Sequence, residues 1–263
     1  MARVRLDILL TERGLVESRS RAAAAVMAGQ VHLGPGRRRA EKPGQLVAAD
    51  VDVSLEALSP YVSRGGIKLA NALDAFGLAV GGRHCLDVGA STGGFTDCLL
   101  QRGADHVAAV DVAYGELHWR LREDPRVTVL ERVNARGLTH DLLPYRPDLV
   151  VADLSFISLG KVLPAVLACA AGSFDCLAMI KPQFEVGRDS ISRGGVVREP
   201  EERRRALVEV AEGARAHGVS VRGFASSGLP GPSGNRETFV WLAEGDRPGG
   251  VGDLVAAAAG VDA

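Results

Sequence analysis

Two charged residues of opposite sign stand where predicted strands end. Asp153 ends an apolar strand over residues 148–153, and Lys181 ends the next strand, over residues 175–181. The carboxyl ends of neighbouring parallel strands meet at one edge of a sheet, where ligands bind in open α/β proteins. A single such charge is often a cap or a surface charge, whereas a pair of opposite sign favours a site. We therefore predict that Asp153 and Lys181 lie together and form part of a ligand-binding site.

A glycine-rich turn follows an earlier apolar run. Asp87 lies in that run, Gly89, Gly93 and Gly94 follow it, and a helix is predicted over residues 94–101. Turn glycines let a ligand approach bare backbone and the helix N-terminus adds free N–H groups, although such glycines can also serve chain packing alone. The spacing is not that of a dinucleotide fingerprint and no P-loop motif is present, so both of those nucleotide-binding classes are disfavoured.

An acidic residue ends the second predicted strand. Asp111 closes the strand over residues 106–111 and lies 24 residues after Asp87. In dinucleotide and nucleoside folds, an acid at this place accepts hydrogen bonds from ribose hydroxyls. The turn and Asp111 together therefore favour a ligand that contains a nucleoside.

The elements that carry these residues alternate regularly after residue 84. Strands that alternate with helices at this spacing predict an α/β fold with a parallel sheet and right-handed crossovers. The Gly- and Ala-rich tail gives no prediction. The predicted strands are 84–88, 106–111, 127–131, 148–153, 175–181, 219–225 and 237–242, and the predicted helices are 94–101, 115–121, 159–170 and a later one from Pro200 to just before Gly218.

A further amphipathic helix is predicted after Ser63. Ser63 and a glycine pair open it, and Leu69 and Leu73 supply part of its apolar face. Lys68 falls in the predicted first turn, where a cation opposes the helix dipole. That mismatch indicates that Lys68 serves something other than helix stability.

Residues 3–56 form a small unit of their own. Residues 1–42 contain nine basic and four acidic residues, although the whole chain has a net charge of −1. A local basic excess of this kind is sufficient for nucleic-acid binding. The predicted elements are a helix over 6–10, a helix over 22–28 with Ser18 in its N-cap cluster, and strands over 30–33 and 47–53.

Length and composition narrow the class of protein. A chain of 263 residues has room for one large domain or for two of unequal size. Its four cysteines lack Cys-x-x-Cys spacing, which fits reduced cytosolic thiols and argues against a disulfide framework or a metal site. The N-terminus is not a secretory signal, and no stretch of about 18 uncharged apolar residues predicts a membrane span. We therefore expect a cytoplasmic protein that does not bind membranes.

The N-terminal motif Arg-Leu-Asp-x-x-Leu-x-x-x-Gly-Leu-x-x-Ser-Arg-x-x-Ala, from residue 5, resembles the small RNA-binding domain named after ribosomal protein S four. In that family, two helices present basic side chains to RNA phosphates. The resemblance implies RNA contacts by Arg5, Arg19, Arg21 and Lys42, and Arg64 is a further predicted contact. Arginine suits phosphate through its bidentate fork, and such contacts position the RNA without reading its sequence. The alternative is a solvated charged face.

Six further motifs together resemble the TlyA family, whose members are S-adenosylmethionine-dependent ribosomal RNA 2′-O-methyltransferases related to FtsJ, some with a haemolysin label. The resemblance implies a Rossmann-like methyltransferase fold whose seven-stranded sheet has the order 3-2-1-4-5-7-6 with the last strand antiparallel. The motifs are Asp-Val-Gly-Ala-Ser-Thr-Gly-Gly-Phe-Thr from residue 87, Asp-Val-Ala-Tyr-Gly-Glu-Leu from 111, Asn-Ala-Arg-Gly-Leu from 134, Val-Ala-Asp-Leu-Ser-Phe-Ile-Ser from 151, Lys-Pro-Gln-Phe-Glu from 181 and Pro-Gly-Pro-Ser-Gly-Asn from 230.

The same resemblance implies the site residues. The family's Lys-Asp-Lys-Glu catalytic tetrad corresponds to Lys68, Asp153, Lys181 and Glu237. The implied cofactor is S-adenosyl-L-methionine, and its implied contacts are Asp87, Gly89, Ser91, Gly93, Gly94, Asp111, Asn134 and Asp153.

The chemistry of the reaction explains these residue types. A ribose 2′-hydroxyl is a poor nucleophile and must lose its proton as it attacks a sulfonium methyl group. Lys181 is predicted to assist that loss with Asp153 orienting it, while Lys68 and Glu237 hold the ribose and phosphate of the target. The sequence after Asp153 lacks the prolines typical of base-amino methyltransferases, which favours a hydroxyl target. The resemblance implies a cytidine in small- or large-subunit ribosomal RNA.

Two other function classes stay open, a pore-forming haemolysin and a non-catalytic ribosome-binding factor. We expect ribosomal RNA or ribosomal subunits as the partner, no obligate protein partner and a monomeric chain. The loop over residues 187–197 either closes over RNA or is a solvated excursion.

The predicted division is 1–57 for the RNA-binding domain, 58–63 for a linker, 64–244 for the methyltransferase domain and 245–263 for a tail.

Overall fold

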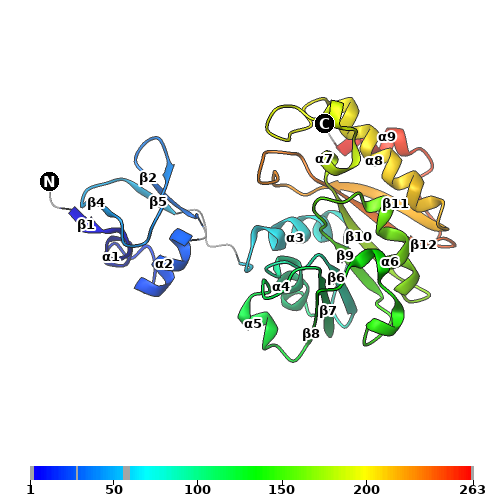
Figure 1. The fold of residues 1–263 in the computed structure, drawn as a ribbon, viewed down its shortest axis with the longest axis horizontal. Helices are drawn as coiled ribbons and strands as arrows, with labels where there is room; N and C mark the ends of the chain where they lie inside the picture. Colours follow the sequence, from blue (N-terminus) through cyan, green and yellow to red (C-terminus); the bar gives the residue numbers. More distant parts are fainter. Residues whose placement is uncertain (1–2, 28, 56–59, 262–263) are drawn as a thin grey trace. The chain divides into compact units, whose positions relative to one another are not determined.

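The chain divides into two compact units, Met1–Pro60 and Tyr61–Ala263, in a computed structural model (Figure 1). The structure describes residues 3–27, 29–55 and 60–261. Residues 56–59, where the small domain is predicted to end and the linker to begin, lie outside the described residues, as does Ala28 at the predicted end of the second helix. Each unit has a hydrophobic core of its own.

The smaller unit packs two helices against short antiparallel strands. Leu6, Leu10 and Ala22 are fully buried at the contact between its helices. The Ser18 hydroxyl accepts a hydrogen bond from Arg21 N–H at 3.2 Å, as expected of a helix cap. The elements are β1 (Arg3–Arg5), α1 (Leu6–Glu12), α2 (Arg19–Met27), β2 (Val31–Leu33), β3 (Arg38–Arg39), β4 (Leu46–Ala48) and β5 (Val53–Leu55).

The single strand predicted over residues 47–53 is wrong. The chain turns where Val51 N–H donates to the Ala48 carbonyl at 3.0 Å, so the segment becomes two strands, β4 and β5. They join different sheets, because β4 pairs with β1 whereas β5 pairs with β2. The alternation of apolar residues continues through the turn, which is why the sequence pattern did not show it.

The larger unit is built on a seven-stranded sheet with the order β11-β12-β10-β9-β6-β7-β8 (Figure 1). Read from the other edge, this is the order 3-2-1-4-5-7-6, so the predicted fold is confirmed. The last strand, β12, is antiparallel to both of its neighbours. The strands are β6 (His84–Val88), β7 (His106–Asp111), β8 (Val127–Glu131), β9 (Leu149–Ala152), β10 (Asp175–Ile180), β11 (Val219–Ser226) and β12 (Thr238–Glu244).

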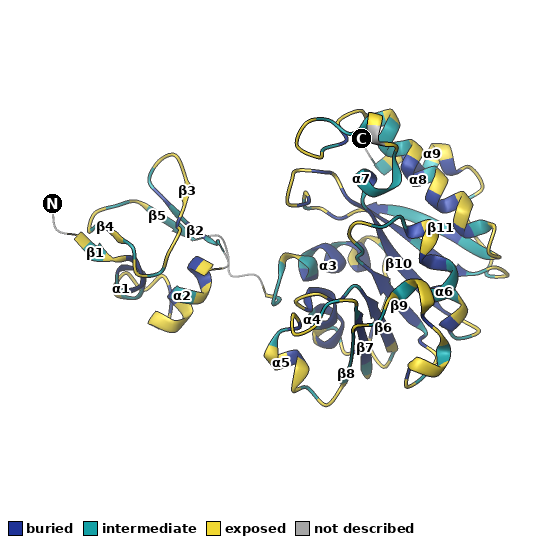
Figure 2. Ribbon diagram, in the orientation of Figure 1, coloured by how far each residue is buried: buried dark blue, intermediate teal, exposed yellow. Residues whose placement is uncertain are grey.

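Helices cover both faces of this sheet, and the strands are buried between them (Figure 2). Alternate residues along a strand face opposite sides, so Cys85 joins the core under α3 and α4, whereas Leu86 joins the core under α6 and α8. The helices are α3 (Arg64–Phe76), α4 (Gly94–Gln101), α5 (Trp119–Arg122), α6 (Leu163–Cys169), α7 (Pro182–Glu185), α8 (Pro200–Arg215) and α9 (Leu254–Val261), with 3₁₀ turns at Ala135–Gly137, His140–Leu142, Leu159–Lys161 and Arg188–Ser190.

Three local predictions need correction. The helix predicted over 115–121 is limited to α5, because Gly115 adopts a φ of +78° in the preceding turn. The helix predicted over 159–170 is divided into a 3₁₀ turn and α6, because Pro164 has no N–H to continue the ladder. Helix α3 begins at Arg64, so Lys68 lies in its second turn and not in the first, and the dipole argument for Lys68 is wrong.

Candidate active site

Lys181 and Asp153 meet at the carboxyl edge of the sheet. Asp153 directly follows β9 and Lys181 directly follows β10, which are parallel neighbours. Lys181 Nζ lies 2.5 Å from Asp153 Oδ1 and donates a hydrogen bond to Ser155 Oγ at 2.9 Å. The lysine side chain is 12% exposed and the aspartate side chain is 25% exposed, so the pair is largely shielded yet open to solvent on one side.

Lys68 and Glu237 form a second, more deeply buried ion pair. Lys68 Nζ donates to Glu237 Oε2, and the two side chains are 9% and 1% exposed. Glu237 comes directly before β12, and Lys68 lies on the buried face of α3. The second carboxylate oxygen, Oε1, is buried and has no hydrogen-bond partner among the described residues. A buried oxygen with unused acceptor capacity is costly to keep.

Strand register brings these two pairs to one edge of the sheet. Ile180 at the end of β10 pairs with Thr238 at the start of β12, so Lys181 and Glu237 extend from adjacent strands. Ala178 pairs with Ala152 in β9, which places Asp153 on the other side of β10. The four residues of the predicted tetrad are thus arranged around the end of β10.

Asp87 is a fully buried carboxylate in β6. Its Oδ2 accepts a hydrogen bond from Thr96 Oγ1 at 2.6 Å, and its Oδ1 has no partner in the part of the chain that the structure describes. Burial raises the pKa of Asp87 to about 7, and the Thr96 hydrogen bond opposes that rise. The negative charges of Asp153 and Asp111 raise the pKa further. A cation bound beside Asp87 would favour its charged form.

Asp111 organises the backbone at the end of β7. Its Oδ2 accepts from Ser91 N–H at 2.7 Å and its Oδ1 accepts from Ala113 N–H at 2.8 Å. Each carboxylate oxygen keeps a second lone pair that can accept a hydroxyl group. Val133 N–H donates to the Asp111 carbonyl at 3.0 Å, so the exposed Asn134 follows directly beside Asp111. Asn134 Oδ1 itself accepts from Arg136 N–H, which fixes the start of a 3₁₀ turn.

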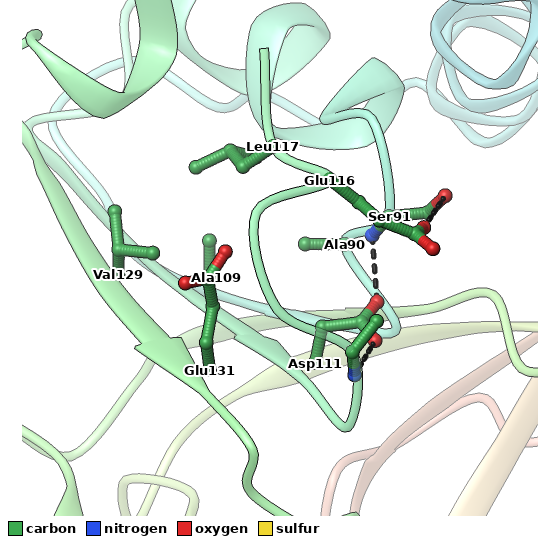
Figure 3. Close-up of a pocket in the computed structure, with 9 residues that line it drawn as sticks. Ala90, Ser91, Ala109, Asp111, Glu116, Leu117, Val129 and Glu131 are labelled. Atoms are coloured by element: carbon green, nitrogen blue, oxygen red, sulfur yellow. Dashed lines mark hydrogen bonds between the residues drawn. The ribbon is translucent and has the colours of Figure 1, made fainter. Parts of the chain in front are cut away.

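A hollow is lined by the turn after β6 and by the carboxyl ends of β7 and β8 (Figure 3). Carboxylates on one part of its wall can accept hydroxyl groups, while alanine, leucine and valine side chains offer an apolar surface. Acceptors for hydroxyl groups beside an apolar wall suit the ribose and base of a nucleoside. The lining residues are Ala90, Ser91, Ala109, Asp111, Ala113, Glu116, Leu117, Val129 and Glu131.

The glycines of the turn after β6 make room for the chain itself. A Cβ at Gly89 would lie 2.4 Å from the Asp153 carbonyl oxygen, and one at Gly93 would lie 2.2 Å from Leu121 Cδ1. A Cβ at Gly94 would lie 2.1 Å from Ser63 Oγ, where α4 packs against the start of α3. Chain packing therefore accounts for the absence of side chains at these positions, which is the alternative that the sequence left open beside the close approach of a ligand.

The structure adds residues that sequence reasoning missed. Glu131 ends β8 and lines the hollow, and the rule that singled out Asp111 could have found it. Phe156 is 90% exposed, has a φ of +65° and has its ring centroid 5.4 Å from that of Phe184. A bulky residue in this conformation is unusual and marks a constrained segment, three residues after Asp153. The sequence contains no signal for that backbone conformation.

In the smaller unit, two predicted RNA contacts are ion-paired to one aspartate. Asp7 is 5% exposed and accepts hydrogen bonds from Arg5 Nε and from a terminal nitrogen of Arg19, both at 3.0 Å. These arginines hold the pKa of Asp7 well below its usual value, and Arg5 has the largest effect. Both arginine side chains are still about half exposed and keep unused donors. Lys42 and Arg21 are also exposed.

Arg64 belongs to the larger unit, where it donates to the Pro230 carbonyl at 2.9 Å.

Among the described residues, no cluster of histidine, cysteine, aspartate or glutamate could hold a metal ion. No helix in the same part of the chain is both long and apolar enough to cross a membrane.

The sheet order and the charged residues at its carboxyl edge define an α/β methyltransferase with a Rossmann-like fold. Residues 61–244 match the model of the FtsJ-like methyltransferase family. The chain belongs to this family and, within it, to the TlyA group, because a TlyA protein of Mycobacterium tuberculosis is 52% identical over 242 residues. That match covers 91% of this chain and 90% of the relative, which is described as a 16S/23S rRNA (cytidine-2′-O)-methyltransferase.

Two further comparisons agree with this membership. A protein of Brachyspira hyodysenteriae described as Hemolysin A is 39% identical over 74% of this chain and 81% of its own length. A solved structure from Streptococcus thermophilus that carries a hemolysin label is 38% identical, with a TM-score of 0.75, and covers 99% of this chain and 96% of that one. The haemolysin label therefore occurs within a family whose fold is that of methyltransferases.

Proposed function

We propose that this protein transfers the methyl group of S-adenosyl-L-methionine to the ribose 2′-hydroxyl of a cytidine in ribosomal RNA. The observation that carries the proposal is the pair of lysine–carboxylate contacts, Lys181–Asp153 and Lys68–Glu237, around the end of β10. The 2′-O-methyltransferase name of the 52% identical relative supports the choice of target. The name of that relative includes both 16S and 23S ribosomal RNA, so the RNA of either ribosomal subunit is a candidate substrate here.

The side chains at the turn after β6 fit the cofactor. The second lone pairs of Asp111 suit ribose hydroxyls. Oδ1 of Asp87, which has no partner among the described residues, suits the cofactor's ammonium group. Backbone at Gly89 and Gly93, the side chains of Ser91 and Asn134, and the hollow of Figure 3 would complete the contacts. The bound cofactor supplies an electrophilic methyl group on a sulfonium centre.

The chain's own residues prepare the hydroxyl group. Lys181, directly after β10, would assist the loss of the hydroxyl proton, because it can stabilise the negative charge that develops on oxygen. Asp153 and Ser155 fix the ammonium group of Lys181 by direct contact. Lys68, held by Glu237, provides a second cation for the target's ribose and phosphate, and such positioning supplies much of the rate acceleration.

The target base and its RNA have separate contacts. The exposed ring of Phe156 offers a stacking surface for an unpaired base close to Asp153. In the smaller unit, Arg5, Arg19, Arg21 and Lys42 would contact RNA phosphates, with Asp7 holding the first two in place. Arg64 would add a contact at the start of α3. The protein would then act in the cytoplasm, as a monomer, on ribosomal subunits.

The test measures transfer of radiolabelled methyl groups to isolated ribosomal subunits, followed by mapping of the 2′-O-methylated nucleotide. Lys181→Ala is expected to lower transfer by about 10²–10⁴-fold while cofactor affinity, measured by calorimetry, stays unchanged. Lys161→Ala is the matched control, because Lys161 is an exposed lysine that follows the same site segment. Full activity of the Lys181 variant would refute its assigned role.

The same assay separates the two alternatives. A non-catalytic ribosome-binding factor would bind subunits but transfer no methyl group. A haemolysin would lyse erythrocytes, and its lysis would persist in Gly93→Arg, in which the arginine side chain would clash with Leu121 and distort the turn.

A further inference from the structure

The turn between β11 and β12 contains a buried asparagine that the proposed mechanism does not use. Asn235 is 1% exposed and lies two residues before Glu237. Its Oδ1 accepts from Val197 N–H at 2.9 Å, and its Nδ2 donates to the Gly195 carbonyl at 2.8 Å. Both ends of the amide are therefore bonded to one distant backbone segment, which fixes the orientation of the side chain.

On the other side, Asn235 closes the turn that contacts Glu237. Gly231 N–H donates to the Asn235 carbonyl at 2.8 Å, and Gly234 N–H donates to the Gly231 carbonyl at 2.9 Å. The Glu237 carboxylate lies directly against Gly231, because a Cβ added there would be 2.5 Å from Oε1. The place of this backbone therefore limits where the Glu237 carboxylate can lie.

The segment held by the asparagine side chain is itself a closed loop. The N–H and the hydroxyl of Ser192 both donate to the Val196 carbonyl, at 3.0 and 2.6 Å. Gly195 N–H donates back to the Ser192 carbonyl at 3.0 Å, and Val197 is buried. Asn235 thus joins a loop to a turn, each of which is closed by its own hydrogen bonds, and the turn contacts the Lys68–Glu237 pair.

We propose that Asn235 is a positioning residue that fastens the loop Ser192–Val197 to the turn Gly231–Asn235 and so fixes the Glu237 carboxylate that holds Lys68. This role rests on the proposed function, because it concerns the pair that holds the target nucleotide. A misplacement of about 1 Å can lower a rate about 10²-fold. Loss of the amide should therefore impair RNA methylation while cofactor binding, which uses other elements, is unchanged.

The first experiment compares Asn235→Ala with Ser233→Ala, an exposed residue of the same turn, in the full-length protein. We expect a loss of about 10- to 100-fold in kcat/KM for ribosomal subunits in the Asn235 variant alone. Cofactor affinity should be equal in both variants. The decisive step repeats Asn235→Ala in a Glu237→Gln background, where it should have little further effect because both changes disturb one unit. Independent, multiplicative losses would overturn the role.

A second variant decides the matter even where Asn235→Ala does not fold. Asn235→Asp keeps the acceptor for Val197 N–H but places a carboxylate oxygen against the Gly195 carbonyl at neutral pH. Protonation restores a donor, so the activity of the variant relative to wild type should rise as the pH falls from about 8 to about 6. A flat ratio would refute the role. An inactive wild type would refute the proposed function itself, whereas an active wild type with unaffected variants would refute this role alone.

Discussion

The two ends of β10 hold buried charge in opposite ways. At the start of the strand, Asp175 is 2% exposed and accepts hydrogen bonds from Arg83 at 2.7 Å, from Trp241 Nε1 at 2.8 Å and from Arg247. Beyond the other end, Glu237 is equally buried but has one cation, Lys68, and one oxygen without a partner among the described residues. We call the carboxylate of Asp175 saturated, because both of its oxygens accept hydrogen bonds. We call that of Glu237 unsaturated, because one of its oxygens accepts none from the described residues.

The difference separates a structural role from a functional one. The carboxylate of Asp175 receives three donors, and each of its two oxygens has at least one partner. The unsatisfied oxygen of Glu237 lowers stability unless a further donor arrives, and such groups are found where function requires them. Asp87, whose Oδ1 also has no partner in the described part of the chain, belongs with Glu237 in this respect.

The largest expected effect comes from removing the cation at the unsaturated end. Lys68→Met leaves the Glu237 carboxylate buried without its ion-pair partner, which should lower the free energy of unfolding by about 3–5 kcal/mol. Methyl transfer should fall at least about 10²-fold, because the target loses a positioning group. Denaturant unfolding and the subunit methylation assay measure the two effects.

The double variant Lys68→Met/Glu237→Gln sharpens that result. It removes both charges, so most of the lost stability should return while methyl transfer stays low. Recovery of activity together with stability would show that the pair is only structural, and the contrast with Asp175 would then disappear.

A change at the saturated end should have the reverse profile. Asp175→Ala removes the acceptor shared by Arg83, Trp241 and Arg247, and should lower the free energy of unfolding by about 2–4 kcal/mol. The side chains of Arg83 and Arg247 are 27% and 22% exposed, so water can partly solvate them after the carboxylate is lost. We therefore expect a smaller loss of stability than in Lys68→Met. The kcat for methyl transfer should stay at the wild-type value at temperatures where the variant is folded. A large fall in kcat with intact folding would contradict the structural role.

Site residues at strand ends could be predicted from the sequence better than contacts between distant segments. Strand-end positions were predictable for Asp111, Asp153 and Lys181, because an apolar run that stops at a charge defines both the strand and its edge. Membership of Lys68 and Glu237 in one site followed only from family resemblance, because these residues are 169 positions apart and meet through tertiary packing. No local pattern encodes such a contact.

The missed features are those that depend on a partner segment. The turn that divides 47–53 into β4 and β5 has the same apolar alternation as a strand, and only pairing with β1 and β2 reveals it. The close packing at Gly94 involves Ser63, and Phe156 has a left-handed conformation although its residue type does not favour one. Spacing along the chain carries no information about these contacts.

The pH dependence of stability tests whether Asp87 is an unsaturated carboxylate like Glu237. Its pKa is raised from the ordinary 3.8 to about 7, chiefly by burial, so the folded protein binds a proton there that the unfolded chain has released. The contribution of Asp87 to the free energy of unfolding is therefore complete below about pH 4 and is lost as the pH rises to about 7 and above. Asp87→Asn keeps the shape and an acceptor for Thr96 but cannot acquire charge.

The expected result is a stability difference that grows with pH. Without cofactor, Asp87→Asn should match wild type near pH 4 and exceed it by about 4 kcal/mol near pH 8, in chemical denaturation at each pH. Asp105→Asn, at an exposed position, is the control and should show no such trend. A pH-independent difference would mean that Asp87 stays charged throughout in the folded protein, through compensation like that of Asp175. The contrast between saturated and unsaturated carboxylates would then rest on Glu237 alone.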